Sequence, residues 1–173
     1  MSSDNTLVYT TFAPRNKQYE ELIWEWLISL RHLAKYTGEA VVFNYGIPPK
    51  LVKEIESFDV SVVPLPYRDA YTISNYRNID VIPHLETYGE DYVFTHYDAD
   101  IWFQKRLTPM FERARGATGV IFATEYNRAC RYRGPEEGQR LNYETQDRVG
   151  GFIFGGWQAA RKQPYIKKLK TMR

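Results

Sequence analysis

The feature that most constrains the fold is an alternation of short apolar segments with amphipathic ones along most of the chain. The apolar segments predict strands at residues 6–12, 40–43, 60–65, 91–97 and 118–124. These segments are almost continuously apolar, which is typical of strands buried on both faces of a parallel sheet. The alternation therefore predicts an α/β domain with a mainly parallel central sheet and helices on both faces.

Helices are predicted between these strands. From Tyr19 to Ala34 apolar residues recur with helical spacing, and Gly38 stands where a C-terminal cap is expected. Shorter helices are predicted from Pro48 to about Phe58, from about Ser74 to Tyr88 with an interruption at Pro83, and from Thr108 to Arg115. A polar stretch then precedes an apolar, Gly-rich run at residues 149–156. No repeat or change of composition marks a second domain, so we expect one domain over residues 1–173.

Composition narrows the classes of partner. A chain of 173 residues that is 43% hydrophobic has enough apolar surface for a core. Its 23 basic and 21 acidic residues leave a net charge of +2, which favours neither nucleic acid nor an anionic membrane as a partner. The single cysteine, Cys130, cannot form an internal disulfide, and no segment resembles a signal peptide or a membrane span. We therefore expect no membrane segment in this chain and a cytoplasmic location by default.

Two carboxylates, Asp98 and Asp100, directly follow the fourth predicted strand in the run YVFTHYDADIWF. A buried carboxylate without a partner would cost several kcal/mol, so the pair needs a cation, hydrogen-bond donors or water. In extended backbone, residues two apart project to the same side, so both carboxylates could face one hard cation such as Mg²⁺ or Mn²⁺. Two carboxylates leave room in the metal shell for water and phosphate oxygens. The pattern thus predicts a metal that bridges a diphosphate at the carboxyl end of the sheet.

This stretch resembles the glycosyltransferases of the GT-A fold, which use sugar nucleotides. YVFTHYDADIWFQKRL is similar to their Asp-x-Asp motif between apolar strands, SNYRNIDVIPHLE resembles their helix with a basic residue near the donor, and VGGFIFGGWQAA resembles the Gly-rich segment of retaining members. The nearest likenesses are the glycogenin-like and blood-group A/B transferase families. The resemblance implies a Rossmann-like GT-A domain. Its activity would be the metal-dependent transfer of a hexose from a UDP- or GDP-sugar to a glycan, glycoconjugate or protein, with Mn²⁺ or Mg²⁺.

The resemblance also implies roles for individual residues. Asp100 would bind the metal directly, Asp98 would hold the ribose, the metal or both, and Arg77 would face the donor phosphates or sugar. His96, two residues before Asp98, would share its side of the strand and support it. The other residues implied to contact the donor are Tyr9, Thr10, Thr11, Tyr97, Asp147, Gly150 and Gly151.

The sequence departs from both families after the Gly-rich run, where they have a further metal-binding or catalytic residue. Either the chain is part of a longer protein, truncated at its C-terminus, or its active site uses fewer residues than the sites of these two families. The retaining class is expected from the likeness, but inversion stays open. One alternative is a non-catalytic sugar-nucleotide-binding module. The other is a phosphohydrolase of the haloacid-dehalogenase type, in which Asp-x-Asp usually follows the first strand and a Thr or Val occupies the position of Trp102.

Overall fold

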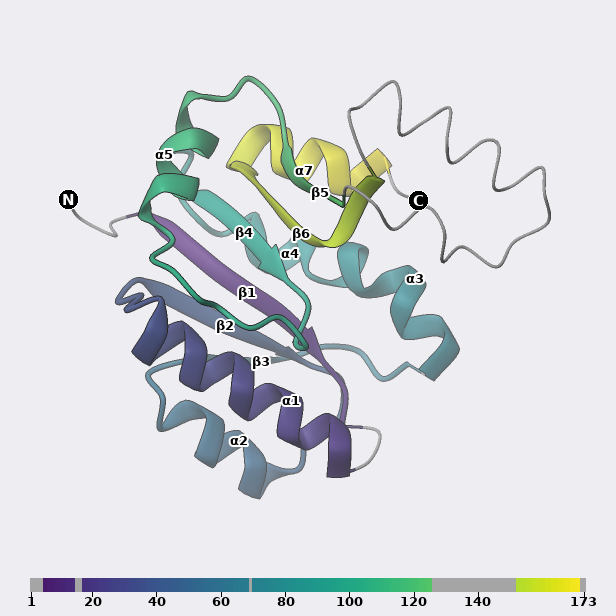
Figure 1. Ribbon diagram of the computed structural model, residues 1–173. Coiled ribbons are helices and arrows are strands. Elements are labelled where there is room, and N and C mark those ends of the chain that lie inside the picture. Colours follow the sequence, from purple (N-terminus) through teal and green to yellow (C-terminus); the bar gives the residue numbers. More distant parts are fainter. Residues whose placement is uncertain (1–4, 15–16, 69, 126–151, 172–173) are drawn as a thin grey trace, which may run out of the picture.

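The computed structural model describes residues 5–14, 17–68, 70–125 and 152–171, and one sheet forms its centre (Figure 1). The sheet has six strands in the order β3-β2-β1-β4-β6-β5. Their bounds are β1 Thr6–Phe12, β2 Glu39–Asn44, β3 Ser61–Pro64, β4 Val93–Tyr97, β5 Ile121–Glu125 and β6 Phe152–Arg161. Strand β6 runs antiparallel to both of its neighbours, so the other five strands run in one direction. The predicted α/β class with a mainly parallel sheet is confirmed.

Helices fill the connections between strands. Their bounds are α1 Lys17–Ile28, a π-helical turn η1 Ser29–Leu33, α2 Pro49–Glu56, α3 Ala70–Asp80, α4 Ile82–Leu85, α5 Thr108–Gly116 and α7 Lys162–Thr171. The predicted interruption near Pro83 is present, and a new helix, α4, starts there. Pro83 lies in the first turn of α4, where a backbone N–H would have no partner within the helix, so its absence costs nothing. Helix α7 was not predicted, since its apolar residues are interspersed with Pro164 and several lysines.

The end of the first helix differs from the expectation that Gly38 caps it. The helix ends earlier, and Lys35 takes the left-handed conformation there, with φ of 51°. Gly38 is needed for a different reason: a Cβ at this position would lie 2.5 Å from the Tyr36 hydroxyl oxygen. That hydroxyl donates to the carbonyl oxygen of Thr6 at 2.8 Å. The glycine therefore leaves space for a buried tyrosine that ties the helix end to β1.

Each face of the sheet has its own hydrophobic core, because side chains alternate along the strands. Val8 and Phe12 of β1 face a core that is completed by α1, α2 and α5, whereas Leu7 and Tyr9 face a core that is completed by α4 and α7 (Figure 1). Trp26 is the largest side chain fully buried on the first face and Tyr165 is fully buried on the second. The two cores hold β1, β2 and β4 in register, so their carboxyl ends meet at one edge of the sheet.

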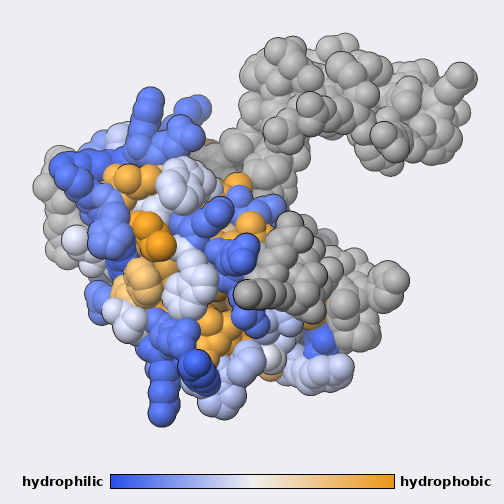
Figure 2. Space-filling view, turned by 60° about the horizontal axis from the view of Figure 1, so that its bottom comes forward, coloured by the Kyte–Doolittle hydropathy of each residue, from blue (hydrophilic) through white to orange (hydrophobic). Residues whose placement is uncertain are grey.

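The surface of the described residues mixes charged side chains with single apolar ones. In the face shown in Figure 2, hydrophilic side chains surround smaller apolar areas. The large apolar side chains with the greatest exposure are Ile28, Leu33, Tyr67, Tyr76 and Trp102. Within the described ranges, no helix combines the length and the apolar character that a membrane crossing requires.

Candidate donor site at the carboxyl edge of the sheet

The acidic pair lies at the carboxyl end of β4, as predicted. Strand β4 ends at Tyr97, and the backbone then turns so that the N–H of Ile101 donates to the carbonyl oxygen of Asp98 at 3.0 Å. The assumption of extended backbone through Asp98 and Asp100 is therefore wrong, because this turn breaks the alternation of the strand. The two charges nevertheless interact: Asp100 is among the groups that raise the pKa of Asp98.

Asp98 is paired with Arg77, which α3 brings to the same edge. Nη1 of Arg77 lies 2.7 Å from Oδ1 of Asp98, and the two side chains are 29% and 25% exposed. Nε of Arg77 is buried and has no hydrogen-bond partner among the described residues. Arg77, which was predicted to face the donor phosphates or sugar, thus forms an ion pair with Asp98, and its contact with a donor stays a prediction.

The environment of Asp98 disfavours its negative charge. Burial is the main cause of the raised pKa of this carboxyl group; the positive charge of Arg77 lowers the pKa and the charge of Asp100 raises it again. Burial and a like charge together outweigh one arginine. An additional cation at this position would therefore stabilise the ionised pair.

His96 lies beneath Asp98, on the same side of β4. Its side chain is 1% exposed, and Nε2 is 3.6 Å from Oδ1 of Asp98, beyond hydrogen-bond distance. Burial, followed by the charges of Arg77 and Lys168, lowers the pKa of His96 to about 3. Because the imidazole is neutral at physiological pH, it adds bulk but no charge behind Asp98.

A second arginine–carboxylate pair joins Asp80 of α3 to Arg68, which precedes that helix, and no sequence pattern predicted it. Nε and Nη2 of Arg68 lie 2.6 and 2.7 Å from the two carboxylate oxygens of Asp80, and the hydroxyl of Tyr45 donates to Asp80 at 2.8 Å. The hydrogen bond from Arg68 is the main cause of the lowered pKa of Asp80. The separation of twelve residues between Arg68 and Asp80 exceeds the three- or four-residue spacing of a pair within one helix, so the local pattern gave no signal for this contact.

Most of the side chains predicted to contact a nucleoside point into the cores. The hydroxyl of Tyr9 lies 2.9 Å from that of Tyr165 in the core beneath α7, and Thr10 is fully buried. Tyr97 is buried against Phe103, with ring centroids 4.7 Å apart. Alternation along the strands turns these residues toward the helices, which leaves Thr11 half-buried at the edge. Nucleoside contacts from this segment stay a prediction.

The capacity of the edge to hold a metal rests on Asp98 and Asp100. Among the described residues, no group of three or more His, Cys, Asp or Glu side chains could hold a metal ion by itself. Two carboxylates still fit Mg²⁺ or Mn²⁺ when the ligand supplies phosphate oxygens and water fills the remaining positions. The raised pKa of Asp98 agrees with a carboxylate that gains from a nearby cation. The predicted donor contacts Asp147, Gly150 and Gly151 lie outside the described residues.

Comparison with known proteins gives matches in structure but not in sequence. No protein-family model and no curated protein matches the chain. Glucosyl-3-phosphoglycerate synthase from Mycobacterium tuberculosis, solved with UDP, is 15% identical, with a TM-score of 0.56 over 92% of this chain and 57% of its own. The galactosyltransferase LgtC, solved with donor and acceptor sugar analogues, is 11% identical, with a TM-score of 0.54 over 97% of this chain and 66% of its own.

A third similar structure is core-mannan synthase A from Aspergillus fumigatus in its Mn/GDP form, at 8% identity and a TM-score of 0.51, over 96% of this chain and 63% of its own. These structural neighbours are glycosyltransferases of the GT-A fold, so the predicted fold is confirmed. The chain spans less than two thirds of the length of each of these three neighbours.

Proposed function

We propose that the chain provides the donor-binding and catalytic part of a glycosyltransferase. It would move a sugar from a UDP- or GDP-sugar to a glycan, glycoconjugate or protein acceptor. The observation that carries the proposal is the pairing of Arg77 with Asp98, beside Asp100, at the carboxyl edge of a GT-A sheet. Ligands of parallel α/β sheets bind at this edge. Three neighbours with the same fold were solved with UDP, with sugar analogues, or with Mn and GDP, which supports a nucleotide-sugar donor.

In this proposal Asp98 and Asp100 hold Mn²⁺ or Mg²⁺, which would supply positive charge to the diphosphate as it leaves. Arg77 would have the complementary task of orienting the diphosphate, because its guanidinium group is fixed by Asp98 through Nη1 and carries N–H groups on two further nitrogens. Donors that are already in place when charge develops lower the barrier of the transfer step. No nucleophile from the protein is needed to break the bond to the leaving group.

The second pair would act by holding α3 in position. Asp80 lies on α3, three residues after Arg77, while Arg68 precedes the helix and Tyr45 directly follows β2. Their hydrogen bonds to Asp80 connect α3 to the end of the sheet. Arg77 is thereby kept within reach of Asp98, so Arg68 and Tyr45 are positioning residues in this proposal.

The retaining, hexose-transferring class is the finer proposal, supported by the likeness of the Gly-rich run to retaining enzymes. A haloacid-dehalogenase-type phosphohydrolase is not favoured, because Asp98 follows β4 and the structural neighbours are glycosyltransferases. A non-catalytic donor-binding module is likewise not favoured, and turnover would separate it from an enzyme.

The test is calorimetric titration with a panel of UDP- and GDP-sugars, with and without Mn²⁺. We expect metal-dependent binding that Asp100→Asn weakens by about tenfold or more, roughly 1.4 kcal/mol. Asp91→Asn is the matched control, because Asp91 is an exposed carboxylate two residues before the start of β4, at the opposite end of the strand from Asp98. Metal-independent binding that is equally strong in Asp100→Asn would contradict the proposal. A nucleotide-release assay with acceptors then distinguishes an enzyme from a binding module.

A further inference from the structure

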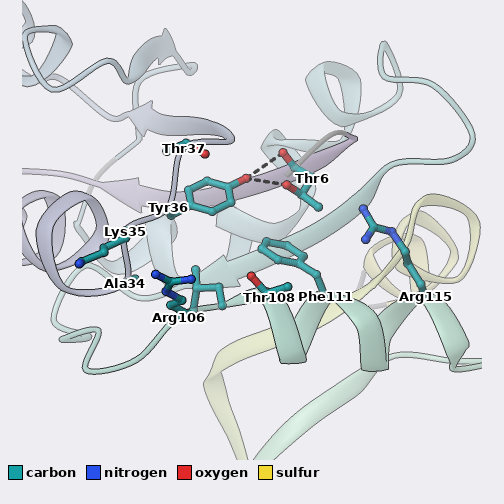
Figure 3. Close-up of a pocket in the computed structure, with 10 residues that line it drawn as sticks. Thr6, Ala34, Lys35, Tyr36, Thr37, Arg106, Thr108, Phe111 and Arg115 are labelled. Carbon is teal, nitrogen blue, oxygen red and sulfur yellow. Dashed lines mark hydrogen bonds between the residues drawn. The ribbon is translucent and has the colours of Figure 1, made fainter. Parts of the chain in front are cut away.

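A pocket of about 210 Å³ opens at the other end of the sheet from the candidate donor site (Figure 3). Thr6, the first residue of β1, lines it, whereas Asp98 follows the last residue of β4, and these two strands are parallel. The other walls come from the end of the first helical segment and from the segment that enters α5. The pocket is therefore separate from the carboxyl edge and has no part in the proposed function.

An aromatic floor gives this pocket a fixed shape. The rings of Tyr36 and Phe111 are stacked, with centroids 5.7 Å apart and planes at 27°. Both side chains are buried, and the hydroxyl of Tyr36 is held by the carbonyl oxygens of Thr6 and Glu39 at 2.8 and 3.0 Å. A pocket built on two buried, packed rings keeps its form without a ligand.

The rim of the pocket is positively charged. Lys35, Arg106 and Arg115 line it, and none of the lining side chains is acidic. In the described part of the chain, neither Lys35 nor Arg106 forms a salt bridge. Figure 3 shows Arg106 and the hydroxyl of Thr108 beside the two rings, with Lys35 toward one end and Arg115 toward the other. Unpaired cations around a concave surface attract anions.

The backbone conformation at Lys35 determines where its side chain lies. Lys35 has φ of 51° at the end of the first helical segment, where the N–H of Tyr36 donates back to the carbonyl oxygen of Leu30 at 3.1 Å. This position strongly favours glycine, because a side chain in left-handed backbone is strained. The left-handed turn ends the helix and places the charged side chain of Lys35 at the mouth of the pocket.

We propose that this pocket binds a small phosphate-bearing anion. Arg106 would pair with two of its oxygens, Lys35 would add a second positive charge, and the hydroxyl of Thr108 would donate a hydrogen bond. The volume of about 210 Å³ is smaller than that of ordinary sites for drug-sized ligands, so a phosphate ion or a phosphate monoester fits better than a whole nucleotide.

The proposal is tested by calorimetric titration of the whole chain with inorganic phosphate at low ionic strength. Arg106→Gln should weaken phosphate binding at least tenfold, about 1.4 kcal/mol. Lys105→Gln is the matched control, because this neighbouring exposed lysine does not line the pocket and its loss changes the net charge equally. Circular dichroism should show that both variants are folded, since both side chains are exposed. Tighter binding of glycerol phosphate than of inorganic phosphate would identify a monoester as the ligand, and its exclusion would identify the free anion.

Two outcomes would overturn the proposal. One is phosphate affinity that is unchanged in Arg106→Gln or reduced equally in Lys105→Gln, since binding would then not depend on the pocket. The other is loss of phosphate binding in Arg77→Ala, which would place the anion at the carboxyl edge instead. We expect Arg77→Ala to impair donor binding and to leave phosphate binding unchanged. This variant therefore distinguishes the proposed donor site from the proposed anion pocket.

Discussion

The two ends of the sheet carry similar numbers of cations in opposite electrostatic arrangements. At the carboxyl edge, Arg77 is paired with Asp98 and Arg68 with Asp80. At the amino end, Lys35 and Arg106 line a pocket that has no acidic lining residue. An edge whose arginines are already neutralised by carboxylates has little net attraction for a diphosphate unless a metal joins it. The two proposals together predict that the carboxyl edge requires a metal cation to bind phosphate and that the amino end does not.

Burial also differs between the two ends. Asp98 and Arg77 are about three-quarters buried, whereas Lys35, Arg106 and Arg115 are exposed. Salt screens exposed charges much more than buried ones. Phosphate binding at the amino end should therefore weaken steeply as salt is added, while metal-dependent donor binding at the carboxyl edge should change less.

The largest effect is expected when the positively charged side chain of Arg77 is removed from the carboxyl edge. Arg77→Ala should weaken donor binding by about tenfold to a hundredfold, roughly 1.4 to 2.7 kcal/mol, because a charged hydrogen bond to phosphate is lost. Arg77→Lys should restore only part of it, since an ammonium group cannot form the same two-point contact. Calorimetric titration with the donor that binds most tightly measures the affinity of both variants. Unchanged donor affinity in Arg77→Ala would place this arginine outside the site.

The next effect concerns stability, and it tests whether Asp80 anchors α3. Asp80→Asn should lower the free energy of unfolding by about 1–3 kcal/mol, because Arg68 and Tyr45 lose an ionised acceptor. Urea denaturation measures the change. Asp59→Asn is the matched control: its side chain is 97% exposed and 3.9 Å from Arg31, so the expected change is below about 0.5 kcal/mol. Equal losses in the two variants would argue against an anchor.

A pH dependence should follow from the buried imidazole beneath Asp98. The pKa of His96 is lowered from 6.5 to about 3, so between these values the unfolded chain binds more protons than the folded one. The stability contributed by the neutral His96 is therefore present above pH 6.5 and is lost as the pH falls toward 3. In His96→Phe, the slope of unfolding free energy against pH in this window should be smaller by up to about 1.4 kcal/mol per pH unit.

This third prediction is measured by urea denaturation at several pH values. His32→Gln, which removes an exposed imidazole, serves as the control variant. A slope in His96→Phe that matches the unaltered protein would show that His96 is accessible to protons in the folded state. The carboxyl edge would then be less buried than the comparison with the amino end requires.

The smallest effect is expected at the amino end. Lys35→Gly should raise the free energy of unfolding by up to about 1 kcal/mol, because glycine adopts left-handed backbone without strain. The same variant should bind inorganic phosphate more weakly than the unaltered protein. Stabilisation with undiminished phosphate binding would show that Lys35 is not retained for the anion. Thermal unfolding and phosphate titration of one preparation provide both values.

Much of the secondary structure followed from local patterns in the sequence. Apolar runs placed β1, β2, β3 and β4 within a few residues of their observed bounds, and Pro83 marked the break between α3 and α4. Such signals depend on backbone conformation and on the periodicity of neighbouring side chains, which the sequence carries directly. The position of Asp98 at the end of a buried strand followed from the same pattern.

The sequence by itself thus determined the alternation of strands and helices, the α/β class and the place of the acidic pair after β4. The tertiary structure alone decided that β4 lies beside β1, that Arg77 reaches Asp98 across 21 residues, and that Lys35 and Arg106 share one pocket. It also decided that the backbone turns at Asp98 and that Tyr9 belongs to a core. The physical reason is that strand order, ion pairs and pockets depend on contacts between distant segments, whose energies are fixed only when both cores are packed.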